Sequence, residues 1–93
     1  MAVAVLNEVD GVTPEIYDAV NAKLGDEIPD GGIVHTAGFT RGKMIVFDVW
    51  ESREHFERFQ EERLRPAIAE VGGENAPTPT QTVYELHHFQ SAD

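Results

Sequence analysis

Residues 33–50 decide the fold, and they read IVHTAGFTRGKMIVFDVW. Two runs rich in β-branched and aromatic residues, Ile33–Thr40 and Met44–Trp50, lie on either side of Arg41-Gly42. This pattern predicts a β-hairpin, because a short turn containing glycine joins two strand-forming runs. A turn centred on Arg41-Gly42 sets the following pairs opposite each other: Phe39 with Met44, Ala37 with Val46, His35 with Asp48, and Ile33 with Trp50.

The sequence before the hairpin predicts one strand and one helix. The Val-rich run Ala2–Glu8 has the composition of a strand. Thr13 is a suitable helix N-cap, and Pro14 fits the first helical position. Apolar residues then recur at helical spacing until Gly25, which is expected to end the helix.

The sequence after the hairpin predicts a second helix and a last strand. Ser52 is the expected N-cap, and apolar residues at helical spacing continue through Val71. Pro66 should kink or restart this helix, because proline lacks the amide donor and clashes with the preceding turn. The run Thr80–Phe89 predicts the last strand.

The resulting element order is β-α-β-β-α-β within a single domain spanning residues 1–93. Right-handed crossovers convert this order into a ferredoxin-like α+β fold, a four-stranded antiparallel sheet with both helices on one face.

Composition excludes several classes of partner. The formal net charge is −10, which argues against binding to nucleic acid or to an anionic membrane surface. The chain has no cysteine, so it offers no disulfide, thiolate nucleophile or cysteine metal site. The N-terminal stretch lacks a basic region and its apolar run is short, so we expect neither a signal peptide nor a membrane span, and a cytoplasmic location.

The two faces of the hairpin predict a homodimer. Ile45, Phe47 and Val49 form the purer apolar set and are expected under the helices. The opposite face is also too apolar to face water; it carries Ile33, Phe39, Met44, Val46 and Trp50. The same face of a second copy is the simplest cover, and two such sheets would close into a barrel.

One candidate site lies on the face predicted to line the barrel. His35 is expected opposite Asp48, and a carboxylate beside a histidine raises its pKa and fixes its tautomer. Such a pair orients a ligand or moves a proton, with Phe39 and Trp50 as walls of the site. The alternative is an ordinary buried ion pair that satisfies two polar groups.

Further candidates lie on the outer strands. The first strand is expected to run parallel to Met44–Trp50, which would place Asn7 and Asp48 at one end of the sheet. The neighbours His87 and His88 must point to opposite faces, and His87 is the candidate ligand contact. No spacing motif supports a metal site, and no cofactor is expected.

Residues 47–59, FDVWESREHFERF, carry a family resemblance. A strand ending in Trp-Glu-Ser, followed by a helix with two phenylalanines, resembles the dimeric α+β barrel superfamily, and most closely its antibiotic biosynthesis monooxygenase-like (ABM-like) members. The resemblance implies a barrel dimer with a ligand site between sheet and helices or in the barrel. Members include cofactor-independent oxygenases of polyketide aromatics, haem-degrading enzymes, isomerases and proteins of no known activity.

The haem-degrading branch uses an Asn on the first strand, and a Trp and a His on the second helix. Asn7 matches the first of these, whereas Phe59 and Ile68 stand at the other two positions. The resemblance therefore does not extend to haem degradation.

Three functions remain open. The first is a cofactor-independent monooxygenase-like or isomerase-like enzyme acting on a hydrophobic, aromatic substrate, in which His35 and Asp48 handle a proton and Asn7 binds a carbonyl or enolate. The second is a non-catalytic ligand-binding module with the same pocket. The third is a dimeric scaffold whose barrel is filled with side chains, and it predicts no cavity.

Overall fold

The computed structural model describes residues 1–25, 27–72 and 78–92. The elements follow the chain in this order: β1 (Val3–Asp10), α1 (Pro14–Leu24), β2 (Gly32–Thr40), β3 (Lys43–Trp50), α2 (Arg53–Phe59), the π-helical turn η1 (Gln60–Leu64), α3 (Arg65–Gly72) and β4 (Thr80–Glu85). No helix in the described ranges is long and apolar enough to cross a membrane.

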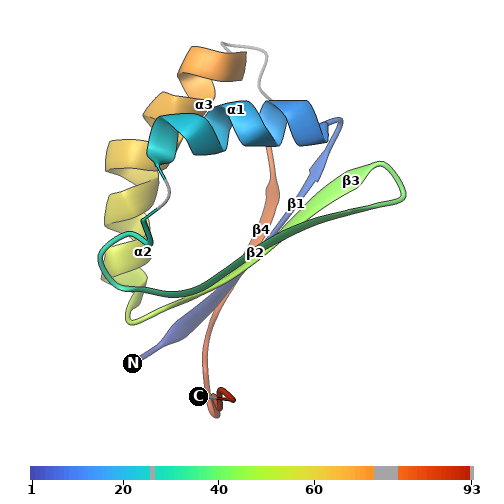
Figure 1. Ribbon diagram of the computed structural model, residues 1–93. Coiled ribbons are helices and arrows are strands. Elements are labelled where there is room, and N and C mark those ends of the chain that lie inside the picture. Colours follow the sequence, from blue (N-terminus) through green and yellow to red (C-terminus); the bar gives the residue numbers. More distant parts are fainter. Residues whose placement is uncertain (26, 73–77, 93) are drawn as a thin grey trace.

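The four strands form one sheet in the order β2-β3-β1-β4, and every neighbouring pair is antiparallel. The helices cover one face of this sheet (Figure 1). The ferredoxin-like α+β fold predicted from the element order is confirmed.

The expected parallel alignment of β1 and β3 is wrong. A crossover through α1 makes β2 parallel to β1, and the hairpin then reverses the chain, so β3 runs antiparallel to β1. Asn7 lies opposite Val46, and Asp48 lies opposite Val5. Asn7 and Asp48 are therefore diagonal neighbours on one face of the sheet, which still allows both to reach one ligand.

The hairpin has the predicted register over most of its length. Arg41 and Gly42 both have positive φ, 51° and 80°, as the two central residues of a type I′ turn require. The pairs Phe39–Met44, Ala37–Val46 and His35–Asp48 are present. The predicted pairing of Ile33 with Trp50 is wrong, because an irregularity between Gly32 and Val34 places Gly32 opposite Trp50.

The prediction of which sheet face lies under the helices is reversed in the structure. Trp50 is 3% exposed and packs against Phe56 and Phe59, with ring centroids 5.9 and 5.2 Å apart. Val3 and Val5 complete this cluster from β1. The large indole fills the space under α2, so the alternate residues of β3, including Asp48, also face the helices.

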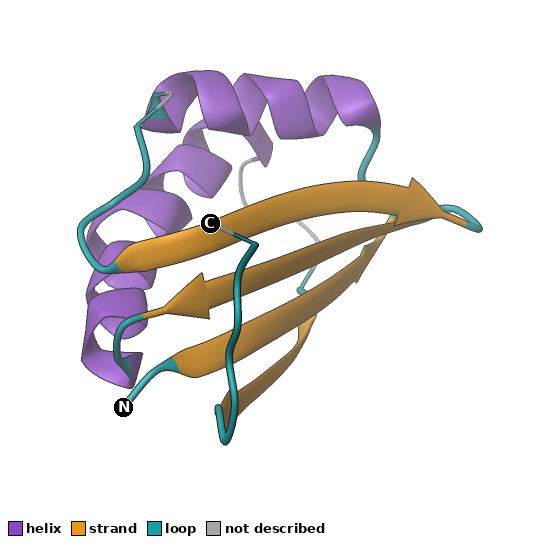
Figure 2. Cartoon of the chain, turned by 60° about the horizontal axis from the view of Figure 1, so that its bottom comes forward, coloured by secondary structure: helices purple, strands orange, loops and turns teal. Residues whose placement is uncertain are grey.

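The other face of the sheet carries Ile45, Phe47 and Val49. The chain after β4 runs below this face in Figure 1 and passes in front of it in Figure 2. Its first hydrogen bond joins the Leu86 N–H to the Ala2 carbonyl at 2.9 Å. β4 ends at Glu85, so the predicted strand through Phe89 is too long.

The interruption expected near Pro66 takes the form of a π-helical turn between α2 and α3. The Arg65 N–H donates to the Gln60 carbonyl, five residues back instead of four. The wider turn removes the conflict between the proline ring and the preceding carbonyls while the helix continues. Gln60, Leu64 and Arg65, from this wider turn and its end, line the cavity described below.

Candidate functional site

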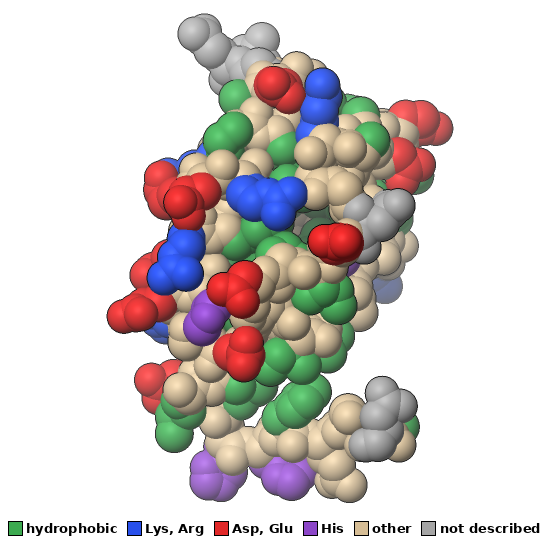
Figure 3. All heavy atoms as spheres, turned by 60° about the vertical axis from the view of Figure 1, so that its left-hand side comes forward, with side chains coloured by type: hydrophobic (Ala, Val, Ile, Leu, Met, Phe, Trp, Pro, Cys, Tyr) green, Lys and Arg blue, Asp and Glu red, His purple; other side chains and the backbone are tan. Residues whose placement is uncertain are grey.

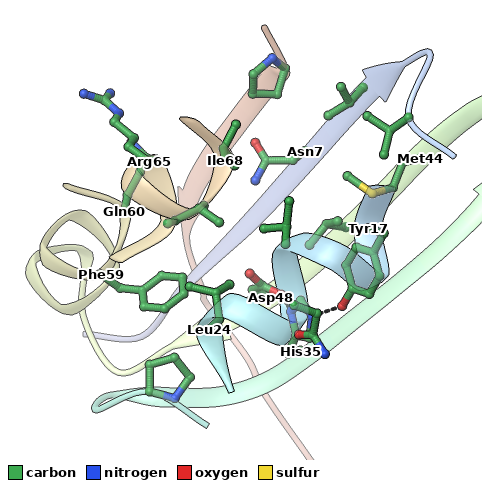
Figure 4. Close-up of a pocket in the computed structure, with 18 of the residues that line it drawn as sticks. Asn7, Tyr17, Leu24, His35, Met44, Asp48, Phe59, Gln60, Arg65 and Ile68 are labelled. Carbon is green, nitrogen blue, oxygen red and sulfur yellow. Dashed lines mark hydrogen bonds and ion pairs between the residues drawn. The ribbon is translucent and has the colours of Figure 1, made fainter. Parts of the chain in front are cut away.

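A cavity of about 960 Å³ lies between the sheet and the helix layer. Its apolar walls come from α1, from the segment after α2 and from the sheet; they include Ile16, Val20, Leu24, Leu64, Ile68 and Val46. Polar side chains enter it at separate points (Figure 4). Apolar walls with a few convergent polar groups are typical of a small-molecule site.

The helix layer around this cavity carries charges of both signs. Figure 3 shows acidic and basic side chains interspersed over its surface, with apolar side chains recessed between them. Several of these charges pair with each other, as Arg65 does with Glu61 and Lys23 with Glu70. On the face drawn in Figure 3, charges of both signs therefore lie close to one another.

A three-residue hydrogen-bond chain crosses the cavity wall. His35 Nδ1 lies 2.6 Å from Asp48 Oδ1, and His35 Nε2 lies 2.8 Å from the Tyr17 hydroxyl (Figure 4). A carboxylate accepts hydrogen bonds only, so Nδ1 carries the proton, and in the neutral ring Nε2 accepts from Tyr17. These two hydrogen bonds therefore hold His35 in one tautomer, with its basic nitrogen Nε2 toward α1.

The pKa values of His35 and Tyr17 are shifted by the contacts within this hydrogen-bonded group. The hydrogen bond that His35 donates to Asp48 raises the pKa of His35; desolvation opposes the increase, and the charge of Asp48 adds to it. Burial raises the pKa of Tyr17, and the charges of Asp48 and Asp18 raise it further. Tyr17 is therefore a neutral phenol at physiological pH and acts as a donor to His35.

A cluster of amide side chains occupies another part of the cavity wall. Gln81 Nε2 donates to Asn7 Oδ1 and to Gln60 Oε1, both at 3.0 Å. Because the first of these bonds engages the Asn7 carbonyl oxygen, the amide N–H group of Asn7 remains for a ligand. The cluster therefore presents Asn7 as a hydrogen-bond donor to an oxygen atom in the cavity.

Trp50 supplies a second donor. Its indole Nε1 is fully buried, and no hydrogen-bond acceptor partners it within the described part of the chain. Burying an N–H group without a partner costs roughly 1–3 kcal/mol. Trp50 lines the cavity, so an acceptor on a bound ligand would satisfy this group.

The structure brings together four of the six residues singled out from the sequence. His35, Asp48, Asn7 and Trp50 all line the cavity. They face the helices and not the predicted barrel, because the indole of Trp50 lies under α2.

Phe39 and His87 do not belong to this group. Phe39 lies beside the hairpin turn and is 44% exposed, beyond the cavity wall. His87 follows the end of β4 and is exposed. The prediction for His87 assumed a longer strand, and the prediction for Phe39 assumed a barrel on this side of the sheet.

Sequence reasoning missed Tyr17, Gln60 and Gln81. Tyr17 flanks the apolar stripe of its helix, and an aromatic ring with a polar tip beside such a stripe was an available signal. The two glutamines carry no comparable signal. Their roles depend on how β4 and the π-helical turn lie against β1.

The side chains around the same cavity bear on metal and haem binding. The described residues contain no group of three His, Asp or Glu side chains arranged to hold a metal ion. Phe59 and Ile68, at the positions that correspond to Trp and His in the haem-degrading branch, line the cavity as apolar side chains.

Comparisons with known proteins agree on the fold. No family model and no curated protein matches the chain. Among solved structures, an ABM-like protein from Deinococcus radiodurans has a TM-score of 0.69 at 12% identity, covering 100% of this chain and 99% of that one. SnoaB, a cofactor-independent oxygenase from Streptomyces nogalater, has a TM-score of 0.67 at 14% identity, covering 95% of each chain.

A third structure shows what this fold accommodates in another protein. A mutant of MhuD, crystallised with two manganese protoporphyrin IX molecules per active site, has a TM-score of 0.69 at 18% identity, covering 97% of this chain and 99% of that one. The likeness at these identities concerns the fold. It extends over nearly the whole chain in each case.

Proposed function

Because the chain has the fold of ABM-like proteins, we propose that it is a cofactor-independent monooxygenase-like enzyme that acts on a hydrophobic, aromatic substrate. One observation carries the proposal: a hydrogen-bonded histidine–carboxylate pair lies on the wall of a large, mainly apolar cavity. Structural neighbours such as SnoaB support this reading, since that protein is a cofactor-independent oxygenase.

In the proposed reaction His35 removes a proton from the substrate. Asp48 holds the Nδ1 proton at 2.6 Å and stabilises the imidazolium that forms. The raised pKa of His35, caused first by its hydrogen bond to Asp48, makes its neutral ring a stronger base. The wall offers two separate donors, the N–H groups of Asn7 and of Trp50, and the enolate oxygen on which the negative charge develops takes one of them.

The remaining chemistry belongs to the substrate and dioxygen. An activated methylene group that has lost a proton is electron-rich and can reduce dioxygen. One oxygen atom ends in the new carbonyl group, and the other leaves as water with the two hydrogens of the methylene group. The reaction balances without an external reductant, so the protein needs only to bind, orient and deprotonate the substrate.

A non-catalytic ligand-binding module is the second candidate, and one observation favours it. The Tyr17 hydroxyl already engages His35 Nε2, the nitrogen that an enzyme would use as its base. The cavity argues against the third possibility, a scaffold filled with side chains, because it leaves about 960 Å³ between the sheet and the helices.

β-Tetralone tests the choice between enzyme and binding module. This fused bicyclic ketone has an activated methylene group, and calorimetry measures its binding while an oxygen electrode measures dioxygen uptake. We expect uptake with the wild type, a loss of about 100-fold or more in His35→Ala with binding retained, and no change in His88→Ala, whose side chain is exposed after β4. Binding without uptake identifies the module, and the absence of both contradicts the proposal.

We further propose that the protein works as a homodimer through the sheet face opposite the helices. Leu6, Ile45 and Phe47 on this face are only partly buried, and Tyr84 is 46% exposed. A second copy with the same face would cover these side chains. The dimer face is thus the one that the sequence had assigned to the core.

A further inference from the structure

Tyr17 meets His35 as a bound phenol would. Its hydroxyl lies 2.8 Å from His35 Nε2, and the two rings are nearly parallel, with an interplanar angle of 11° and centroids 6.4 Å apart. The contact joins α1 to β2 across the cavity wall (Figure 4). A side chain of the protein therefore occupies the hydrogen-bonding position that the proposed substrate would need.

His35 cannot accept hydrogen bonds from two phenolic hydroxyl groups at once. Its Nδ1 is engaged by Asp48, and the neutral ring has one further acceptor, the lone pair of Nε2. A ligand hydroxyl that donates to Nε2 must therefore displace the Tyr17 hydroxyl.

The helix that carries Tyr17 is weakly held to the sheet. No residue of α1 is buried, and Ile16 is 41% exposed although it belongs to the apolar stripe. That stripe lines the cavity instead of packing against the strands. Because α1 packs against α3 and makes few contacts with the strands, a pivot away from the sheet separates little apolar surface between the helix and the strands.

The ends of α1 allow such a movement. Gly11 precedes the helix with φ of 81°, and Gly25 follows it with φ of 88°. Open space surrounds both glycines, since a Cβ atom on either would meet nothing within 4 Å. Element-terminal residues of this kind absorb the dihedral changes of hinge motion.

Besides its packing against α3, the other side-chain polar contacts of α1 within the described residues lie at its C-terminal end. Arg63 Nη2 donates to the Leu24 carbonyl at 2.6 Å, and Lys23 Nζ lies 3.5 Å from Glu70 Oε2. Tyr17 lies in the first half of the helix, where its bond to His35 is the side-chain link to the sheet. These positions favour a pivot about the C-terminal end that withdraws Tyr17.

We propose that Tyr17 closes the His35 site from within, and that a ligand with a phenolic hydroxyl takes its place on His35 Nε2 as α1 pivots away. This inference rests on the proposed function and assigns its site a ligand class, a planar aromatic compound with a free hydroxyl group. Such a hydroxyl is the enol form of an activated ketone, so its loss of a proton to His35 gives the same enolate as the loss from the methylene group. Tyr17 is then a positioning residue, because a ligand hydroxyl can bond to His35 Nε2 only by replacing the hydrogen bond that Tyr17 already makes.

Calorimetry with naphthol and with its methyl ether tests the competition. The methyl ether cannot donate to Nε2, so it occupies the cavity without displacing Tyr17. The ratio of its dissociation constant to that of naphthol then measures the net contribution of the hydroxyl group. In Tyr17→Phe the internal competitor is gone, and we expect this ratio to rise about fivefold, the equivalent of one net hydrogen bond. Tyr84→Phe is the matched control on β4 and should leave the ratio unchanged.

Each outcome separates this inference from the proposed function. If both compounds bind but the ratio stays constant or falls in Tyr17→Phe, the cavity binds aromatic ligands and the competition is refuted. If neither compound binds, the proposed ligand class is refuted. Amide hydrogen exchange of the ligand-free protein tests separately whether Tyr17 holds α1 against the sheet. Tyr17→Phe should speed exchange in α1 several-fold and leave β1 and β3 unchanged, and equal exchange in α1 overturns the closure.

Discussion

His35 on β2 lies directly opposite Asp48 on β3, and 2.6 Å separates His35 Nδ1 from Asp48 Oδ1. The pair is asymmetric in its surroundings: the side chain of Asp48 is 12% exposed, and that of His35 is 46% exposed. The carboxylate is thus held in the wall, while the imidazole stays accessible to ligand and to protons from solvent.

This arrangement gives the stability of the protein a defined pH dependence. The hydrogen bond that His35 donates to Asp48 raises the pKa of His35 above its unfolded value of 6.5. The folded protein therefore binds more protons than the unfolded chain between the two pKa values. The contribution is fully present below pH 6.5 and is lost as the pH rises through the folded pKa.

Urea unfolding at a series of pH values measures this contribution. We expect the free energy of unfolding of the wild type to fall as the pH rises above about 6.5, by a modest amount because His35 is half exposed. Asp48→Asn removes the principal cause of the shift, so its profile should be flatter. A profile that Asp48→Asn leaves unchanged would show that another group produces the dependence.

The buried indole N–H of Trp50 leads to a second expectation. Trp50→Phe keeps an aromatic ring in the cluster but removes the unpartnered donor. Binding of β-tetralone relative to tetralin, the same ring system without the carbonyl group, should weaken about fivefold for the loss of one hydrogen bond. Calorimetry measures both affinities.

Phe59→Leu is the matched control for Trp50→Phe. It also shortens a side chain of the same aromatic cluster, but it removes no donor. Its ratio of affinities should equal that of the wild type. An equal loss in both variants would mean that packing, and not the indole N–H, determines ketone binding.

The hairpin could be predicted because its register depends on local information. The turn residues fix which strand positions face each other, so the pairing of His35 with Asp48 follows from counting along the chain. The failure at Ile33 is equally local. An irregularity at the start of β2 shifts the pairing register between β2 and β3, and no residue pattern in that stretch predicts it.

The choice of face could not be predicted in the same way. Both faces of β3 are apolar, so counting apolar residues did not distinguish the one under the helices. Which face of the sheet lies under the helices depends on side-chain volume, since the indole of Trp50 fills the space between α2 and the sheet. Tyr17 was missed for a related reason: its contact with His35 depends on how α1 crosses the sheet, which no local pattern specifies.

Gly31 gives a third expectation, on stability. It has φ of 85°, and a Cβ atom at this position would lie 2.3 Å from His55 Cγ. Gly31→Ala should therefore suffer both backbone strain and overpacking, about 2–4 kcal/mol in total. Gly11→Ala is the control, because its φ of 81° is similar but its surroundings are open.

Thermal or urea unfolding of the two glycine variants separates strain from crowding. Gly11→Ala should lose about 1 kcal/mol, from the positive φ alone. The difference between the variants then measures how tightly the start of β2 is packed against α2. Equal losses would mean that the His55 ring moves aside without cost.

The oligomeric state tests both the homodimer and the assignment of the sheet faces. Phe47 lies on the face opposite the helices, whereas Phe39 pairs with Met44 on the helix side near the hairpin turn. Sedimentation should find a wild-type dimer, a monomer for Phe47→Glu and a dimer for Phe39→Glu, because only the first variant buries a charge in the proposed interface. The reverse result would place the interface on the face that carries His35, and the cavity would then be shared between subunits. A monomeric wild type would leave the open face without a second copy to cover it, while the cavity, which is built within one chain, would remain available for ligand.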